Sequence, residues 1–508
     1  MGYKELELNV PTDFCEEQIR HLIEKKIGLD EFTWHIKKKS LDARKKADIH
    51  WKLRVGVVGS LIKSDAMDFE PTLSIPYKKG RGRALVVGGG PAGFFSAFVL
   101  QKAGYDVSLV ERGADVETRS ARIQQFEKTG QFDPLGNYVF GEGGAGTFSD
   151  GKLTSRTKNI SQGKSFVMSS YIDAGAPAEI SYLARPHLGS DRLKSIVKNL
   201  TGQFQALGGR VFFETTLDDL TIKNGMVVEA LTSRGGIEAD HFIVAPGHSA
   251  YDTYRMLIGR GVMFRSKNFA IGSRMEHSQD LINRAQWGRA ELPGVKAAEY
   301  RLTSKGDGKC SVYTFCMCPG GVVVPATATP YTNIVNGMSL YARDGEYANA
   351  GCVAGLNLEK LMEREVSALE SLDWLEALEK KFFDAASGFQ APSCGIQEFI
   401  DGKGKSEIPA SSYPFGLKPA PLWELLPSPV SRSLCEGLKD FSRKIKGFET
   451  GVLMGLESKT SSPVQALREK DGRCVGFKNL AIVGEGSGVA GGIISSAVDG
   501  ISHAMKLL

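Results

Sequence analysis

Residues 83–112 constrain the fold more than any other part of the chain, because they combine a strand, a glycine loop, a helix and a second strand. Residues 84–87 form the short apolar, β-branched run that is typical of a buried parallel strand. The run ends in Gly-x-Gly-x-x-Gly, where Gly88 permits a tight turn, Gly90 lets backbone approach a pyrophosphate, and Gly93 lets the next helix pack on the strand. This stretch therefore predicts a dinucleotide-binding α/β fold.

The helix that follows, residues 91–103, directs the unpaired N–H groups of its first turn at the glycine loop, a field that suits a diphosphate. The second strand, residues 106–110, ends at Glu111, close to the spacing of about 20 residues expected from the first glycine. A carboxylate there accepts hydrogen bonds from a ribose 2′-OH and repels a 2′-phosphate, which favours FAD or NAD over NADP. The cofactor contacts expected here are Gly88, Gly90, Pro91, Ala92, Gly93, Glu111 and Arg112.

Further candidate cofactor contacts lie outside this stretch. Arg119, on the next predicted helix, could neutralise a phosphate or lie at the surface. The sequence GEGGAGTFSDGKL at residues 141–153 is too rich in glycine for a strand or helix and suits close backbone approach to a flat or charged ligand, although a flexible surface loop is the alternative. The residues concerned are Gly143, Gly144, Ala145, Gly146, Thr147, Ser149, Asp150, Gly151 and Lys152.

Two strand ends complete the predicted ligand crevice. A strand at residues 239–245 closes on Gly247, and the carboxyl ends of parallel strands line such crevices. Near the end of the chain, a strand at residues 479–483 runs into a glycine loop and a helix at residues 494–507. No second strand with a terminal acid follows, so we interpret this segment as the last strand of the same fold. Its candidate contacts are Gly484, Glu485, Gly491, Gly492 and Ile493.

The chain length of 508 residues predicts two or three domains. We divide it into a small N-terminal α+β domain (residues 1–80), an FAD- or NAD-binding part (83–253), an inserted α+β substrate domain (254–450) and the returning nucleotide-binding part (451–508), with a linker at residues 71–83. Eight scattered cysteines favour a reducing compartment over a disulfide framework. With no signal sequence, membrane span or metal-binding pattern, we expect a cytoplasmic protein without a metal site.

The N-terminal domain carries a basic cluster. It consists of Lys37, Lys38, Lys39, Arg44, Lys45, Lys46, Lys52 and Arg54. The cluster could bind RNA or an acidic partner, but a solvated loop and strand face is favoured, because no stacking aromatics recur in register with the charges.

The inserted domain holds the candidate catalytic residues. Cys316 and Cys318 are one residue apart and face the same side of a strand, so they could form a redox or nucleophilic pair, although buried inert cysteines are commoner. His277, with Arg274 nearby, could transfer protons or serve structure alone. Lys459, like Arg274, would favour an anionic or electron-rich substrate.

Taken together, the motifs resemble a known family. The first glycine loop, Glu111 and the closing Gly-Glu-Gly at residues 484–486 are similar to the FAD-binding fold of glutathione-reductase-type flavoproteins. More narrowly, GEGGAGTFSDGKL, RPHLGSD, GSRMEHS, YTFCMCPGG, NGMS, ESKTSSPV and GEGSGVAGGIISSAVDGI resemble the largely uncharacterised FAD-utilising dehydrogenases (FAD-dependent oxidoreductases) over nearly the whole chain. The broader pattern has Gly-Asp where this chain has Gly484-Glu485.

The resemblance implies a discontinuous Rossmann-like FAD-binding domain and a dehydrogenase or reductase activity. FAD would place its pyrophosphate at residues 88–93, its adenosine ribose on Glu111 and its ribityl chain near residues 484–485; the ring would lie between residues 143–152 and 491–493. The substrate is expected to be an anionic small molecule. No second complete glycine fingerprint is present, so a dedicated NAD(P)H domain is not expected, and reducing equivalents would come from transiently bound NADH or NADPH or from the substrate directly. Two alternatives stay open: a flavoenzyme that modifies RNA through the basic N-terminal domain, and a non-catalytic FAD-binding module.

Overall fold

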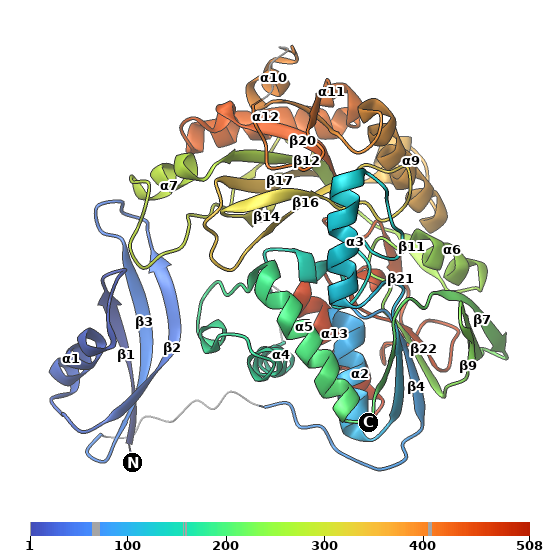
Figure 1. Ribbon diagram of the computed structural model, residues 1–508, viewed down its shortest axis with the longest axis horizontal. Helices are drawn as coiled ribbons and strands as arrows, with labels where there is room; N and C mark the ends of the chain where they lie inside the picture. Colours follow the sequence, from blue (N-terminus) through green and yellow to red (C-terminus); the bar gives the residue numbers. More distant parts are fainter. Residues whose placement is uncertain (1, 63–71, 156, 158–159, 405–408) are drawn as a thin grey trace.

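The computed structural model describes residues 2–62, 72–155, 157, 160–404 and 409–508 (Figure 1). The predicted linker begins at Pro71, which lies outside the described residues. Among the described residues, no helix is both long and apolar enough to cross a membrane.

The nucleotide-binding part is built on a five-stranded parallel sheet with the order β22-β10-β4-β5-β6. Its strands are β4 (Arg83–Val87), β5 (Asp106–Val110), β6 (Arg210–Phe212), β10 (His241–Val244) and β22 (Leu480–Ile482). The first and the last of these strands in the sequence are therefore separated in space by β10 alone. This arrangement confirms a parallel α/β sheet assembled from two distant segments.

Helices cover this sheet and join the two segments. Helix α2 (Pro91–Ala103) packs against α13 (Ile493–Lys506), and both contribute to one apolar cluster with Phe95, Ala97 and Ile494. The contact is close: a Cβ on Gly500 of α13 would lie 2.1 Å from the carbonyl oxygen of Ala92. The other elements of this part are α3 (Val116–Thr129), η1 (Gly144–Phe148), α4 (Ser161–Asp173), η2 (Ala178–Ser181), α5 (Gly189–Ala206), α6 (Tyr251–Gly259) and η4 (Gly484–Ser487), with an antiparallel sheet of β7 (Leu217–Lys223), β8 (Met226–Thr232) and β9 (Gly235–Ile237).

The second part is a seven-stranded sheet with the order β13-β14-β17-β12-β20-β18-β19, covered by helices on its outer face (Figure 1). Its strands are β12 (Phe269–Ser278), β13 (Thr303–Ser304), β14 (Val312–Cys318), β17 (Tyr347–Leu356), β18 (Ala391–Gly395), β19 (Leu417–Pro419) and β20 (Val452–Glu457). The helices are α7 (Gln279–Trp287), α8 (Leu358–Met362), α9 (Ala368–Ala386), α10 (Ile396–Asp401), α11 (Leu422–Leu425), α12 (Ser428–Lys444) and η3 (Phe448–Thr450).

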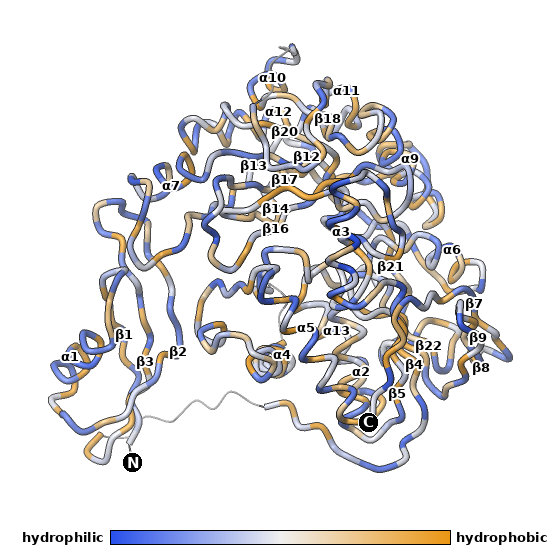
Figure 2. Tube along the Cα trace, viewed as in Figure 1, coloured by the Kyte–Doolittle hydropathy of each residue, from blue (hydrophilic) through white to orange (hydrophobic). Residues whose placement is uncertain are grey.

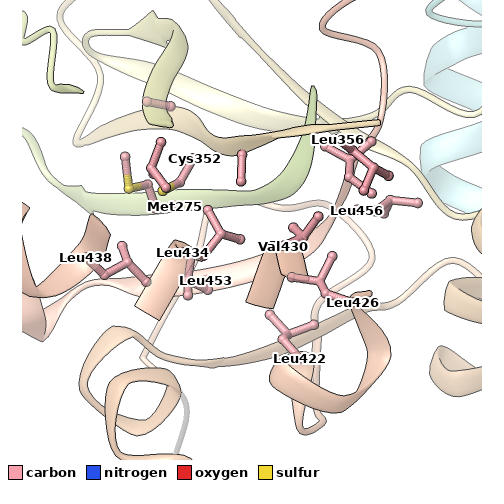
Figure 3. Packing of buried hydrophobic residues seen from close by; sticks show 14 of the residues in the cluster. Met275, Cys352, Leu356, Leu422, Leu426, Val430, Leu434, Leu438, Leu453 and Leu456 are labelled. Carbon is pink, nitrogen blue, oxygen red and sulfur yellow. The ribbon is translucent and has the colours of Figure 1, made fainter. Parts of the chain in front are cut away.

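An extensive hydrophobic core lies between this sheet and its helices. In Figure 3, Leu434 and Leu438 of α12 face Met275 and Cys352 of the sheet. Figure 2 shows the same division along the chain, since hydrophobic segments follow central strands such as β4 and β17.

The seven-stranded sheet continues beyond the domain boundary that we drew at residue 450. Strand β20 is antiparallel to β12 and β18 and is buried along its whole length, so it belongs to this sheet. Two small sheets adjoin it: β11 (Phe264–Ser266) with β21 (Val464–Ala466), and β15 (Gly321–Pro325) with β16 (Val335–Ser339). The chain returns to the parallel sheet at β22.

The N-terminal domain is an antiparallel sheet with the order β1-β3-β2 and one helix packed on it. The elements are β1 (Gly2–Val10), α1 (Glu16–Ile27), β2 (Thr33–Asp42) and β3 (His50–Gly59). This α+β lobe lies to one side of the body (Figure 1) and joins it through β2, where the amide of Lys39 donates to the carbonyl of Tyr182 and its own carbonyl accepts from the amide of Ala184.

Candidate active site

A pocket of about 910 Å³ lies between the two larger parts of the structure. One wall is formed by the carboxyl ends of the parallel strands and by the loop at residues 144–152, and the other wall by β14. Its volume is near the upper end of the range for small-molecule and cofactor sites. Of the predicted cofactor contacts, Gly88, Gly90, Pro91, Ala92, Glu111, Arg112, Gly144, Ala145, Gly146, Ser149, Asp150, Gly151, Lys152, Gly247, Glu485, Gly491, Gly492 and Ile493 line it.

The three fingerprint glycines serve different purposes. A Cβ on Gly88 would lie 2.2 Å from the carbonyl oxygen of Ala245, and one on Gly93 would lie 1.9 Å from that of Gly88, so both are required for packing. A Cβ on Gly90 would meet only the Cα of Gly144, at 3.8 Å. Since Gly90 lines the pocket, its missing side chain keeps space open for a ligand.

Helix α2 offers hydrogen-bond donors beside this space. Its first helical hydrogen bond runs from the amide of Phe94 to the carbonyl of Gly90, at 2.9 Å. The amides of Ala92 and Gly93 therefore have no acceptor within the helix, and Pro91 has no amide hydrogen to satisfy. Together with the helix dipole, these donors suit a diphosphate.

Glu111 is buried at the end of β5, as the fingerprint predicts. One carboxylate oxygen accepts from the amide of Gly89 at 2.6 Å, and the other from the amides of Gly113 and Gly141, both at 2.9 Å. The carboxylate therefore joins the first glycine loop to the second and still lines the pocket. Next to it, Arg112 binds Asp252, with Nη2 2.9 Å from Oδ1.

Arg119 does not reach the pocket, which contradicts the predicted phosphate contact. Its side chain is completely buried and donates to the carbonyl oxygens of Asn137 (2.8 Å), Glu142 (3.0 Å) and Gly144 (2.9 Å). The guanidinium thus shapes the second glycine loop from behind. Thr147 also turns away, because its hydroxyl donates to the carbonyl of Glu142 at 3.0 Å.

Two of the predicted glycine contacts belong to packing. A Cβ on Gly143 would lie 2.1 Å from the hydroxyl of Thr147, and one on Gly484 would lie 2.5 Å from the Cβ of Ala92. Neither glycine lines the pocket, and the same is true of Gly93.

The closing segment presents a second helix terminus to the pocket. A carboxylate oxygen of Glu485 accepts from the amide of Gly492 at 2.5 Å, and the other lies 3.6 Å from Nδ1 of His248. Glu485, which stands where the broader flavoprotein pattern has Asp, thereby fixes the turn into α13. The first helical bond of α13 runs from Ser496 to Gly492, which leaves the amides of Ile493 and its two successors without helical acceptors.

These features fit FAD. The ligand space extends from a buried acid through a helix terminus with free donors to a second helix terminus, and a Cβ at Gly90 would project into it. Both termini favour negative charge.

A buried charged cluster connects the second glycine loop to the seven-stranded sheet. Arg343 donates to Asp150, with Nε 2.9 Å from Oδ1, and Ser339 and Lys152 also donate to this carboxylate. Burial alone would raise the pKa of Asp150, but the cations of Lys152 and Arg343 hold it well below its usual range. Lys152 also donates to the carbonyl of Met317 on β14.

The predicted catalytic residues lie at different depths. Cys316 is half-buried and lines the pocket, whereas Cys318 is buried behind it. Arg274 is fully buried and forms an ion pair with Glu457, Nη1 to Oε2 2.7 Å, with both side chains at 0% exposure. It cannot attract a substrate, because the pair is sealed from the pocket, although Arg274 also donates to the carbonyl of Cys316 at 2.6 Å.

His277 and Lys459 do not form the predicted substrate site. Nε2 of His277 lies 2.8 Å from the carbonyl of Phe448, and burial lowers the pKa of this histidine to about 4. His277 does not line the pocket, so the structure contradicts the predicted proton transfer there. Lys459 touches the pocket, but its Nζ is buried against Glu379 (2.8 Å) and the hydroxyl of Tyr251 (2.6 Å).

Other cations line the part of the pocket where Arg274 and Lys459 were expected. Arg185, Arg301 and Arg343 line the pocket beside Cys316. Arg185 pairs with Glu299, whereas Arg301 is exposed and has no acidic partner within 4 Å among the residues that the structure describes. No motif marks Arg301 in the sequence, since it lies in irregular structure just before β13. Nowhere in the described ranges do three His, Cys, Asp or Glu side chains gather as a metal site would require.

Comparisons with family models agree with this geometry. Residues 268–460 match the C-terminal domain of FAD-dependent proteins, residues 81–128 match an FAD-binding domain, and residues 3–58 match a domain of unknown function. The second and third matches fall on the β4–α2–β5 unit and on the N-terminal lobe. FAD is therefore the cofactor of this chain.

Among solved structures, the chain is similar to CtdE in complex with FAD (12% identity, 84% of this chain and 82% of that chain, TM-score 0.32). It is also similar to a glycine oxidase from Bacillus cereus ATCC 14579 (10% identity, 84% of this chain and 94% of that chain, TM-score 0.33). A third similar structure is a geranylgeranyl bacteriochlorophyll reductase-like protein from Thermoplasma acidophilum (12% identity, 84% of this chain and 78% of that chain, TM-score 0.37).

A much nearer relative is an uncharacterised protein of Clostridium beijerinckii (strain ATCC 51743 / NCIMB 8052). It is 39% identical over 490 residues, which cover 93% of this chain and 91% of the relative. At this coverage the shared region includes the nucleotide fingerprint and the seven-stranded sheet. The chain belongs to the same family as this clostridial protein, a family of FAD-dependent proteins.

Proposed function

We propose that this protein is an FAD-dependent oxidoreductase that acts on an anionic small molecule. The observation that carries the proposal is the continuity of the pocket, which runs without a break from the FAD cradle at Gly88–Gly90 to Cys316 on β14. A protein that kept FAD only for structure would not need the pocket to reach residues such as Arg301 and Cys316, which lie outside the expected FAD contacts. When bound, FAD supplies the two-electron chemistry, and the protein orients it and selects the substrate.

The chain's own residues have distinct tasks in this proposal. The amides in the first turns of α2 and α13 donate to the diphosphate and favour negative charge on the bound cofactor. Asp150 fixes Lys152 and Arg343 beside the pocket, and Lys152 bridges to the carbonyl of Met317. This network holds the glycine loop against β14, so that cofactor and substrate spaces keep one geometry.

The charge of the pocket supports an anionic substrate. Near β14 its lining contains four cations, Lys152, Arg185, Arg301 and Arg343, and two carboxylates, Asp150 and Glu299. The carboxylates are already paired with Arg343 and Arg185. Arg301 is therefore the residue that we assign to substrate binding.

The test of this assignment is Arg301→Gln, with Arg289→Gln as the matched control. Arg289 is exposed and lies outside the pocket lining. An anionic compound found in a screen for oxidation or reduction of the bound flavin should show a KM about 10-fold higher in Arg301→Gln, because a charge-assisted hydrogen bond contributes roughly 1.5 kcal/mol. The control should keep the original KM. Equal KM values in both variants would remove Arg301 from the substrate site.

We further propose NADH or NADPH as a transient electron donor. Anaerobic mixing in a stopped-flow instrument should bleach the flavin absorbance with one of the two. If neither nucleotide nor any compound in the screen changes the flavin spectrum, the non-catalytic FAD-binding module becomes the better interpretation.

The RNA-modifying alternative receives less support from the N-terminal lobe. Glu5 accepts from Lys37 and lies 3.6 Å from Arg54, so part of the basic cluster is neutralised on its own sheet. RNA binding at low salt that weakens steeply as salt rises would favour this alternative again.

A further inference from the structure

The two cysteines of β14 lie on a distorted part of the sheet. Strand β14 pairs regularly with β17 up to Phe315, opposite Gly351, and pairing resumes only at Cys318, opposite Asn349. Between these positions the strand bulges, and Cys316 has φ +43°, a left-handed conformation that costs a non-glycine residue free energy. Strain of this kind is retained where it positions a functional group.

The bulge brings the two sulfur atoms together. Two residues of fully extended chain span about 7 Å, the upper limit of the Cα separation that a disulfide accepts. At the bulge the two Sγ atoms lie 4.0 Å apart. Side-chain rotation that closes this gap by about 2 Å would bring the sulfur atoms to the S–S bond length, so that two-electron oxidation could join them. The Cys-x-Cys spacing, which on a regular strand says little about thiol exchange, becomes compatible with a reversible bond here.

The two thiols differ in access. Cys316 lines the pocket shared with the FAD cradle, whereas Cys318 is buried and donates to the carbonyl of Cys316 at 3.3 Å. In dithiol sites, the accessible sulfur attacks the substrate and the neighbouring sulfur resolves the mixed disulfide that forms.

Cations hold the same segment from both sides. Arg274 donates to the carbonyl of Cys316 and lies 3.5 Å from the sulfur of Cys318, and Lys152 donates to the carbonyl of Met317. Hydrogen bonding by the Cys318 thiol, together with the charges of Lys152 and Arg274, lowers the pKa of Cys316. By contrast, burial raises the pKa of Cys352, Cys394 and Cys474 to about 12, as expected for inert core thiols.

We propose that Cys316 and Cys318 form a reversible dithiol–disulfide couple that exchanges two electrons with FAD, and that the substrate is a small anionic disulfide. This inference rests on the proposed oxidoreductase function and names the substrate class of the same pocket. Arg301, which has no acidic partner among the described residues, gives the pocket the positive charge that such a compound requires.

Each step of this exchange conserves electrons and protons. The Cys316–Cys318 disulfide takes two electrons and two protons from the reduced cofactor and becomes two thiols, of which Cys316 ionises. The Cys316 thiolate attacks a disulfide RSSR, forms a Cys316–S–S–R bond and expels RS⁻. The sulfur of Cys318, on losing its proton, then attacks Cys316, reforms the internal disulfide and expels the second RS⁻. The two protons released by the cysteines leave with the two thiolates as RSH.

The first experiment measures the couple without any turnover. The FAD-loaded protein is equilibrated in buffers of reduced and oxidised dithiothreitol, quenched with acid, alkylated and analysed by peptide mass spectrometry. We expect Cys316 and Cys318 to lose reactivity together at one potential, with a peptide mass lower by two hydrogens. Cys310→Ser is the matched control, because it removes a neighbouring thiol on the same tryptic peptide and should leave this transition unchanged. If both thiols stay reduced at every ratio, the inference is wrong.

The second experiment assigns the attacking sulfur with 5,5′-dithiobis(2-nitrobenzoate) as the small anionic disulfide. Cys318→Ser should retain one 5-thio-2-nitrobenzoate on Cys316, whereas the wild type should release it and carry an internal disulfide. Label on Cys316 of the wild type at the same level as in Cys318→Ser would refute the resolving role. If these tests fail while NADH or NADPH still reduces the flavin, the oxidoreductase proposal stands and the dithiol couple is rejected. If the couple forms but no donor reduces the flavin, the two cysteines form a disulfide and the oxidoreductase proposal is rejected.

Discussion

Replacement of Gly90 by valine separates the demands of the cofactor from those of the fold. Gly90 is the N-cap of α2 with φ −72° and ψ 178°, a conformation open to valine. A Cβ at this position would meet only the Cα of Gly144, at 3.8 Å, so the protein has room for the new side chain. The pocket does not, because the valine methyl groups would occupy the space in front of α2.

The loss of affinity follows from the donors at that helix terminus. A diphosphate displaced by the valine loses the hydrogen bonds of the Ala92 and Gly93 amides, which have no acceptor within the helix. A hydrogen bond to a charged group contributes about 1.5–3 kcal/mol, so two of them contribute about 3–6 kcal/mol. The Kd for FAD should therefore rise by roughly 100- to 20,000-fold.

The assay compares FAD content and affinity with the stability of the apoprotein. The absorbance ratio at 450 and 280 nm reports the flavin that copurifies, and quenching of FAD fluorescence gives the Kd. Gly202→Val is the matched control, since a Cβ there meets nothing within 4 Å and Gly202 lies on α5 away from the pocket. A yellow Gly90→Val protein with wild-type affinity would refute the reasoning. An apoprotein much less stable than the Gly202→Val control would mean that the fold, rather than the cradle, had been damaged.

Two further substitutions test the corrected roles of buried residues. Glu457→Gln leaves the guanidinium of Arg274 buried without its ion pair and should lower the free energy of unfolding, measured in urea, by about 3–5 kcal/mol. The control Arg284→Gln breaks an exposed ion pair and should lower this free energy by less than about 1 kcal/mol. Equal losses in the two variants would contradict the burial argument. His277 has a folded-state pKa near 4 and an unfolded-state value near 6.5, so its contribution is present above pH 6.5 and is lost as the pH falls toward 4. Between pH 7 and pH 5, the free energy of unfolding should therefore fall by about 2 kcal/mol more in the wild type than in His277→Asn, which lacks the titrating imidazole. The rate of flavin reduction should be the same in both proteins, and a slower rate in His277→Asn would support the catalytic role.

The residues nearest to the first glycine loop were predictable because they interact locally. Strand β4, helix α2 and strand β5 occur where the glycine pattern places them, and Glu111 is buried at the end of β5. The pair Asn224 and Gly225, which favours a tight hairpin turn, joins β7 to β8 with φ values of 53° and 73°. Such features depend on backbone geometry over a few residues, which the residue types themselves restrict.

The chemistry of charged side chains could not be assigned in the same way. Arg119, Arg274 and Lys459 resemble substrate or phosphate ligands in the sequence, but each is buried against partners. Glu457, which neutralises Arg274, lies 183 positions away in the chain, and Glu379, which binds Lys459, lies on a separate helix. Whether a cation faces a pocket or a carboxylate depends on which strands become neighbours, and no local pattern carries that information.

Short glycine and strand patterns were sufficient to predict the dinucleotide-binding fold and the joining of two distant segments, because these patterns have steric requirements of their own. The sequence does not show which cations remain available to a substrate, or whether Cys316 and Cys318 can meet. Both depend on how the seven-stranded sheet packs over the cradle, and the bulge that turns Cys316 toward the pocket exists only through the pairing of β14 with β17.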